Sequence, residues 1–186
     1  MPIRFLLALS CFFALSASAV QLTSDTFARQ ANGAGLAEVQ LGNMAIQKAQ
    51  NPAVKAFAET MIKDHGQANT ELETVAMQDG IRLPTTPPPD ANAAADALRL
   101  ESGPAFDRAY VARMVQDHEQ AVALFRAAAT QDGVNQDLRA FAQKTLPVLQ
   151  HHMQEALQLD KQLGGAAQQS STAPAAPVAV SAEVVP

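Results

Sequence analysis

The sequence has one cysteine, no tryptophan and one tyrosine. The cysteine, Cys11, lies close to the N-terminus, so neither a disulfide nor a cysteine-bound metal is expected in the rest of the chain. With Tyr110 as the only tyrosine and no tryptophan, the side chains that usually stack on nucleic-acid bases are scarce. These absences leave a hydrophobic core as the expected source of stability.

The N-terminus has the three parts of an export signal. Arg4 is followed by an apolar run over residues 5–15, and the small residues Ala17 and Ala19 form a typical cleavage pattern. The run is too short to span a bilayer, which needs about 20 apolar residues. We therefore predict a cleaved signal peptide in residues 1–19 and a periplasmic or secreted protein without a transmembrane segment after cleavage. A membrane anchor and lipidation of Cys11 are the weaker alternatives.

Charge and composition bound the remaining chain. Subtracting Arg4 from 13 basic residues leaves 12, against 18 acidic ones, so the formal net charge is −6. An acidic chain without basic clusters argues against nucleic acid and anionic membranes as partners. Residues 164–186 are rich in Ala, Pro and Gln and carry only one charge, Glu183, which predicts a disordered tail. Residues 20–163 are then expected to form one domain.

Four segments repeat apolar residues with the 3.6-residue period of an amphipathic helix, and their ranges are 25–49, 52–78, 104–131 and 136–162. Asn51 followed by Pro52 is a typical helix start. Gly80 and Gly133 each suit the left-handed position that follows a helix. No segment has the alternating pattern of a strand.

The connections between these segments predict the topology. The first and last connections are short, whereas residues 80–103 form a long, proline-rich crossover with a short helix expected at 91–100, capped by Asp90. Two antiparallel hairpins joined by one long crossover is the connectivity of ferritin-like bundles. We therefore predict an all-α, ferritin-like four-helix bundle.

Four polar residues interrupt the apolar stripes of the predicted helices: Glu38, His65, His118 and His152. At 100° per residue all four point inward, whereas the neighbouring His151 points away. Counting 1.5 Å per residue from the turns places them at similar heights along the helices. One carboxylate and three imidazoles are therefore expected to converge in a middle layer.

Such a layer has two interpretations. Imidazole and carboxylate ligands suit zinc, copper, iron or nickel, which predicts a metal site at these four residues. Alternatively they form a structural hydrogen-bond network, in which His65 and His118 pair with Glu38 or Tyr110 and the protein is a non-catalytic interaction or stress-related module with a protein partner. Asp64 and Asp117 each precede a histidine, and a solvated helix surface is the favoured location for both over a role in orienting an imidazole.

Several enzyme classes are excluded by missing motifs. No glutamate is followed three residues later by histidine, which argues against a carboxylate di-iron centre. Neither a Ser-His-Asp pattern nor a glycine-rich phosphate loop is present. Catalysis therefore ranks third, and it would need an open coordination position or a cleft beside the polar layer.

Several motifs together resemble the DUF4142 family of bacterial envelope proteins. They include Phe27 followed by Glu38, the run from Met61 to Asp64-His65, and Asp117-His118. The similarity covers residues 24–163. It implies a ferritin-like helical bundle in the bacterial envelope, and it implies no activity, because the function of the family is unknown.

Overall fold

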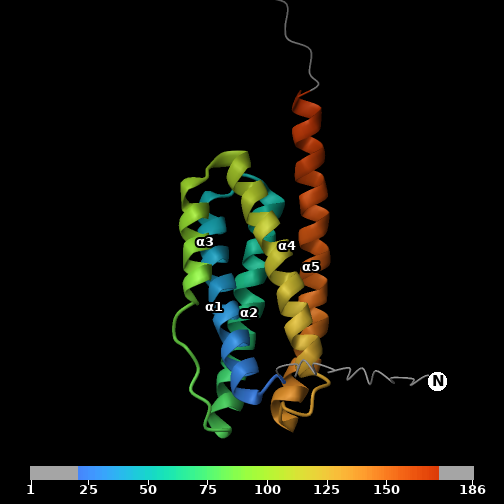
Figure 1. Ribbon diagram of the computed structural model, residues 1–186. Helices are drawn as coiled ribbons and strands as arrows, with labels where there is room; N and C mark the ends of the chain where they lie inside the picture. The colour runs from blue at the N-terminus through green and yellow to red at the C-terminus, as the bar shows by residue number, and fades with distance from the viewer. Residues whose placement is uncertain (1–20, 172–186) are drawn as a thin grey trace, which may run out of the picture.

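The computed structural model describes the backbone of residues 21–171 and the side chains of residues 21–164, and this part of the chain holds five helices and no strand (Figure 1). Their bounds are α1 Ser24–Lys48, α2 Pro52–Gln78, α3 Pro89–Leu100, α4 Gly103–Ala128 and α5 Gln136–Ser171. The all-α prediction is therefore confirmed. The predicted signal peptide and residues 172–186 of the predicted tail lie outside the described residues.

The four long helices surround one core. The helix α1 packs against α2 and α4, and α5 packs against the same two helices, while α3 lies on the outside against α1 and α4. Each of the pairs α1–α2 and α4–α5 forms an antiparallel hairpin (Figure 1). This arrangement lets all four long helices direct side chains into a common interior.

The helix starts follow from local sequence. The side chain of Thr23 accepts a hydrogen bond from the Thr26 amide at the start of α1, and that of Asn51 accepts one from the Ala53 amide at the start of α2. The predicted Asp90 cap is wrong, because α3 begins at Pro89 with Pro88 as its N-cap and Asp90 lies within its first turn.

Two helix ends differ from the sequence prediction. Gly80 has a φ of 69°, as predicted, but Gly133 has no positive φ. A Cβ at Gly133 would lie 2.4 Å from the Leu22 carbonyl oxygen, so close packing of the chain explains the glycine there. The helix α5 ends at Ser171 rather than near Gln162, because the alanines and glutamines after Gly164 favour helix.

Glycines on α1 let the first hairpin close tightly. A Cβ at Gly35 would lie 2.1 Å from the Asn69 side chain, and one at Gly42 would lie 2.8 Å from that of Ile62. These contacts bracket His65, so they fix the height and depth at which α2 presents this histidine to the core.

The α1–α2 turn is pinned to α4 by a buried carboxylate. Both Asp107 oxygens accept backbone hydrogen bonds, from Gln50 at 3.1 Å and from Asn51 at 2.9 Å. Because these amides belong to the turn and Asp107 to α4, the pair fixes the two hairpins relative to each other at this end.

The apolar core consists of two clusters. The first, here called the Tyr110 cluster, lies toward the α1–α2 turn and includes Leu41, Phe57, Met61, Phe106, Tyr110, Met114 and Leu159. The second, here called the Phe cluster, lies toward the α4–α5 turn and includes Phe27, Leu72, Phe125, Leu138 and Phe141. Neither includes the buried histidines. No helix in the described residues is long and apolar enough to cross a membrane.

Candidate metal centre

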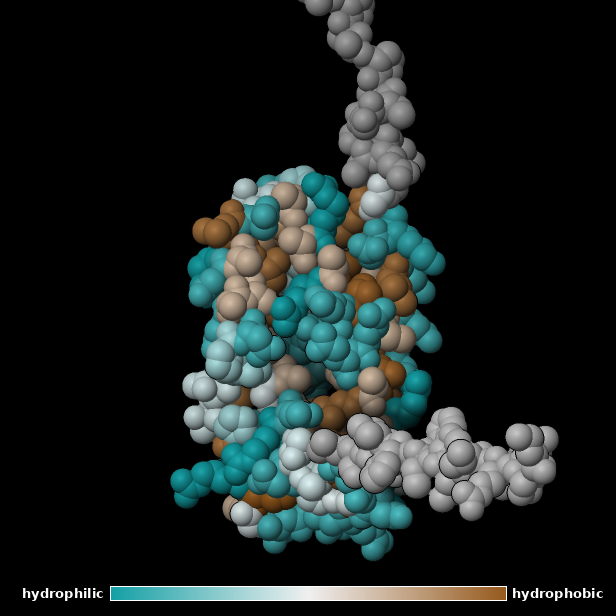
Figure 2. Space-filling view, viewed as in Figure 1, coloured by the Kyte–Doolittle hydropathy of each residue, from teal (hydrophilic) through white to brown (hydrophobic). Residues whose placement is uncertain are grey.

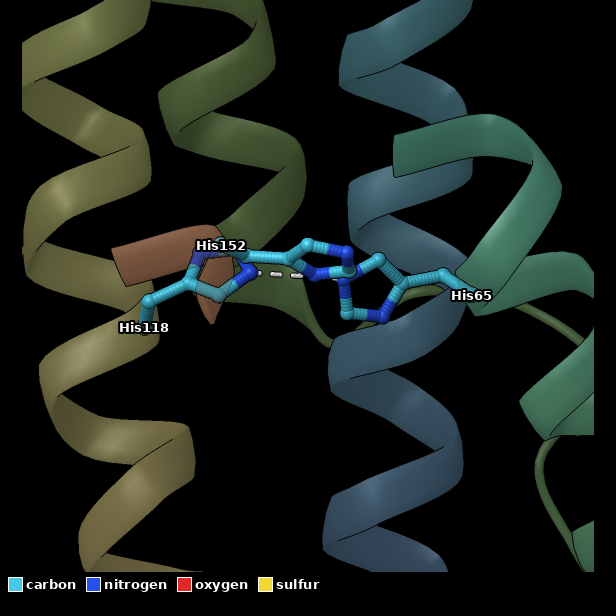
Figure 3. Close-up of side chains that lie close together, drawn as sticks. All are labelled: His65, His118 and His152. Carbon is cyan, nitrogen blue, oxygen red and sulfur yellow. Dashed lines mark hydrogen bonds between the residues drawn. The ribbon is translucent and has the colours of Figure 1, made fainter. Parts of the chain in front are cut away.

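Three buried histidines from three helices converge between the two apolar clusters. Figure 3 shows the imidazoles of His65 on α2, His118 on α4 and His152 on α5 directed toward one another. One ring nitrogen from each lies within 4.8 Å of the others. The ring centroids are 5.4–5.5 Å apart. The inward phase predicted for these residues therefore matches the structure; that they bind a metal stays a prediction.

The orientation of His118 is fixed by its own helix. Its Nδ1 lies 2.9 Å from the carbonyl oxygen of Met114 and donates to it, since a carbonyl can only accept. In the neutral ring this leaves a lone pair on Nε2, which lies 3.4 Å from Nε2 of His65. The backbone of α4 thus selects the tautomer that directs an acceptor into the centre of the layer.

The orientation of His152 is fixed by Asp64. The Nε2 of His152 donates to Oδ2 of Asp64 over 3.0 Å, while its Nδ1 is buried and meets no hydrogen-bond partner in the described chain. A carboxylate that holds one nitrogen of an imidazole while the other stays free is the usual support of a metal-binding histidine. Asp64 is still 29% exposed, but it contacts an imidazole, as in the alternative that sequence analysis placed second.

All three imidazoles are held in the neutral form. Burial lowers the pKa of His65 well below its ordinary value, and the His118 and His152 rings lower it further. Burial lowers the pKa of His118 to about 4, against the opposing hydrogen bond to Met114. Burial also lowers the pKa of His152, which the Asp64 carboxylate partly offsets. At neutral pH each ring therefore offers a lone pair, as a metal ligand must.

Glu38 lies beside the histidines but outside the group of converging nitrogens. Its Oε1 is 4.0 Å from Nδ1 of His118, the nitrogen already bound to Met114, and its Oε2 has no partner within residues 21–164. Burial, reinforced by the charge of Asp117 and opposed by Arg113, raises the pKa of Glu38 well above its ordinary value. Glu38 therefore faces the side of His118 away from the other two imidazoles.

Asp117 and Tyr110 complete the polar layer on the α4 side. Arg113 donates to Asp117 at 2.5 Å, and the Asp117 side chain is only 15% exposed, so its predicted location on a solvated surface is wrong. The Tyr110 hydroxyl is buried, and burial together with the Glu38 charge raises its pKa well above the ordinary value. His65 pairs with His118 rather than with Glu38 or Tyr110.

A small cavity adjoins two of the imidazoles. It has a volume of about 30 Å³ and is bounded in part by Glu38, His65, Asp117 and His118. A volume of this size holds a water molecule or an ion. The fourth histidine of the chain, His151, is exposed and lies 3.5 Å from Glu155, so it stays apart from the layer as its phase predicted.

Comparisons with known proteins show similarities of family and of fold. Residues 13–159 match the family model DUF4142, a domain of unknown function. No curated protein matches the sequence significantly. Among solved structures, a putative secreted DUF305 protein from Streptomyces coelicolor has 12% identity and a TM-score of 0.65, covering 76% of this chain and 94% of that one.

A second structural neighbour has been solved in metal-bound forms. CopM in its Cu(II)-bound form has 19% identity and a TM-score of 0.64, covering 77% of this chain and 99% of its own. CopM in its Ag-bound form has 20% identity and a TM-score of 0.63, with coverage of 77% and 98%. At such identities the likeness shows a shared helical fold.

Proposed function

The chain belongs to the DUF4142 family, whose function is unknown, and from that premise we propose that it binds a divalent transition-metal ion through His65, His118 and His152. The observation that carries the proposal is the convergence of three neutral, buried imidazole nitrogens within 4.8 Å of one another. The bound ion would draw the three lone pairs to a common centre.

The spacing of the nitrogens supports this proposal. Two tetrahedral ligands, each 2.0–2.1 Å from zinc, lie about 3.3–3.4 Å apart. The Nε2 atoms of His65 and His118 are already 3.4 Å apart, so these two rings need little movement. Asp64 and the Met114 carbonyl hold the opposite nitrogens of His152 and His118, which keeps the free lone pairs directed inward.

The donor set favours copper(II) or zinc(II). Imidazole nitrogen suits both ions, and a site of this kind binds copper(II) more tightly than zinc(II). The Cu(II)-bound form of the neighbour CopM agrees with this choice. Glu38, which sequence analysis grouped with the ligands, is assigned a place beside the site, because its nearest contact is to the nitrogen of His118 that faces Met114.

The proposal includes the architecture and location of the protein. The two antiparallel hairpins and long crossover support classification as a ferritin-like four-helix bundle in residues 20–163. The signal-like residues 1–19 support export to the periplasm or outside the cell. An exported chain meets metal ions from the environment, which agrees with a metal-binding role.

The competing function is a structural polar layer in an interaction module. The His65–His118 and His152–Asp64 hydrogen bonds favour it, because they pair polar side chains of the layer with one another. The two functions differ in one respect. A structural layer has no metal affinity, whereas a metal site takes up one ion per chain.

Metal analysis of untagged protein tests the proposal. We expect about one equivalent of copper or zinc to remain bound after dialysis, and we expect a His65→Ala/His118→Ala double variant to bind none. His151→Ala is the matched control, since this exposed histidine lies next to the site in sequence but outside it in space. The double variant removes two core side chains and could fail to fold. The metal content of His118→Gln, which keeps most of the side-chain volume, is therefore measured as well. Negligible metal in the wild type would refute the site.

A further inference from the structure

A groove opens the polar layer toward one face of the molecule. It lies between α1, α4 and the crossover and has a volume of about 580 Å³. Its floor has small side chains, among them Gly33, Ala37 and Ala121, and its outer wall includes Pro84 and Pro88 of the crossover. In Figure 2 this face is visibly hollowed between α1 and α4.

The groove and the small cavity beside the histidines share a thin wall. Four residues line both spaces: Ala34, Glu38, Asp117 and Ala121. On the inner side the same cavity is bounded by His65 and His118. Two alanines and two carboxylic side chains therefore separate the imidazoles from the groove.

Three carboxyl groups lead from the rim of the groove to the histidines. Asp90 is exposed at the rim and close enough for its charge to act on Asp117, whose charge in turn acts on Glu38. Glu38 then lies 4.0 Å from His118. Its Oε2 is buried and bonds to nothing in the described residues, so one oxygen is free to receive a ligand.

The positive charges of the groove are already engaged with carboxylates. Arg29 forms a salt bridge with Asp25, and Arg113 forms one with Asp117. Asp117, which the Arg113 side chain binds, is the middle one of the three carboxyl groups between the rim and the histidines. A cation that passes along the groove would therefore compete with Arg113 for Asp117.

We propose that this groove is the path by which the metal ion reaches and leaves the histidine site, with Asp117 and Glu38 as transient oxygen ligands and Arg113 as a latch. The proposal rests on the proposed metal site. Oxygen ligands bind divalent ions more loosely than imidazoles do along the copper and zinc series, so the ion moves from weaker to stronger ligands. The crossover supplies the outer wall of the groove, so under this proposal it forms the entrance of the path.

Binding kinetics with Co(II) as the probe test the path, because its visible absorption changes on coordination by nitrogen. Stopped-flow mixing of the full metal-free protein with Co(II) gives association rates, and competition with a chelator gives dissociation rates. We expect Asp117→Asn to slow association about tenfold through loss of local attraction. Glu38→Gln should slow association as well, because an amide cannot give up a proton to become a charged oxygen ligand for the passing ion. Glu119→Gln, an exposed change on α4, is the matched control and should keep the wild-type rate.

Two further variants separate a path from a merely structural role. Arg113→Gln removes the latch, so it should speed association severalfold, a direction that structural damage would not produce. Ala34→Leu narrows the path with a larger side chain at an exposed position. It should slow association and dissociation by the same factor and so leave the Kd unaltered. Ala123→Leu, at an exposed alanine of α4 outside the groove, is its control.

The outcomes distinguish the path from the site. Wild-type rates in Asp117→Asn, Arg113→Gln and Ala34→Leu, with Co(II) still bound, would overturn the path and leave the site intact. A wild-type protein that binds no Co(II), Cu(II) or Zn(II) would overturn both.

Discussion

Two groups of three aromatic rings lie in the same core and have opposite character. Phe27, Phe125 and Phe141 have ring centroids 5.2–6.5 Å apart. The three histidines, about two turns away along α4, have centroids 5.4–5.5 Å apart. The ring spacing is thus similar, but only the imidazoles carry atoms that need polar partners.

The difference teaches that the two parts of the core contribute unequally to stability. The Phe rings are satisfied by packing alone. The histidine layer instead buries Glu38 Oε2 and His152 Nδ1 without a partner in the described chain, and each such atom costs about 1–3 kcal/mol. Under the proposed function, a bound metal ion would offset part of this cost.

The largest expected effect belongs to the Phe cluster. Phe27→Ala should lower the free energy of unfolding by about 3–5 kcal/mol, because Phe27 is fully buried against Phe125 and the space it leaves cannot collapse. Urea denaturation measures the loss. Leu100→Ala, at a side chain 87% exposed, should change stability by less than about 0.5 kcal/mol. Equal losses in the two variants would contradict the assignment of this core.

The histidine layer should instead make the metal-free protein sensitive to acid. The pKa of His118 is about 4 in the folded protein and 6.5 ordinarily. Above pH 6.5 the ring is neutral in both the folded and the unfolded chain, so its burial causes no pH-dependent loss of stability there. As the pH falls from 6.5 to 4, the unfolded chain takes up a proton that the folded protein refuses. His118 alone then costs about 3 kcal/mol. His65 and His152 act in the same direction, because burial lowers their pKa values too.

Glu38 opposes this acid sensitivity. Its pKa is raised, so the unfolded chain loses a proton above about pH 4.5 that the folded protein keeps, and Glu38 destabilises the fold as the pH rises. Urea midpoints between pH 7 and 5 should therefore fall more steeply in Glu38→Gln than in the wild type. His151→Ala should keep the wild-type slope. A flat wild-type profile would contradict burial of neutral imidazoles.

Added metal should stabilise the folded protein through the histidine layer. At a free concentration of 100 times Kd, an ion that binds only the folded state adds about 2.7 kcal/mol. The Tm of the wild type should rise with zinc or copper and fall back with EDTA, whereas the Tm of His65→Ala/His118→Ala should not respond. An equal response in both proteins would indicate binding elsewhere.

The smallest effect should come from the carboxylate that orients His152. Asp64→Asn should weaken metal binding about 10–100-fold, because the amide can no longer hold the imidazole with a charged acceptor. Isothermal titration measures the change. His151→Ala, at the neighbouring residue, should leave the affinity unaltered. An unaltered affinity in Asp64→Asn would remove Asp64 from the proposed site.

The sequence predicted most of the fold because each helix has a clear apolar stripe and a proline or cap at its start. The same periodicity placed His65, His118 and His152 inward, since phase and height depend only on regular helix geometry. It could not assign Asp64 to His152, because this contact depends on how α2 and α5 are rotated about their axes. Nor could it place Glu38 relative to the His118 ring, which depends on side-chain rotamers and on the hydrogen bond to Met114.

The long crossover has a further consequence for the integrity of the fold. It runs from the end of α2, beside the α4–α5 turn, to the start of α4, beside the α1–α2 turn, so His65 and His118 are separated by 53 residues in sequence although their rings are in contact. An ion held by His65 on one hairpin and by His118 and His152 on the other would act as a cross-link that restricts the unfolded chain, as a disulfide does. Residues 21–171 contain no cysteine. Under the proposed function this cross-link is removable, and the supply of metal sets how firmly the two hairpins are held together.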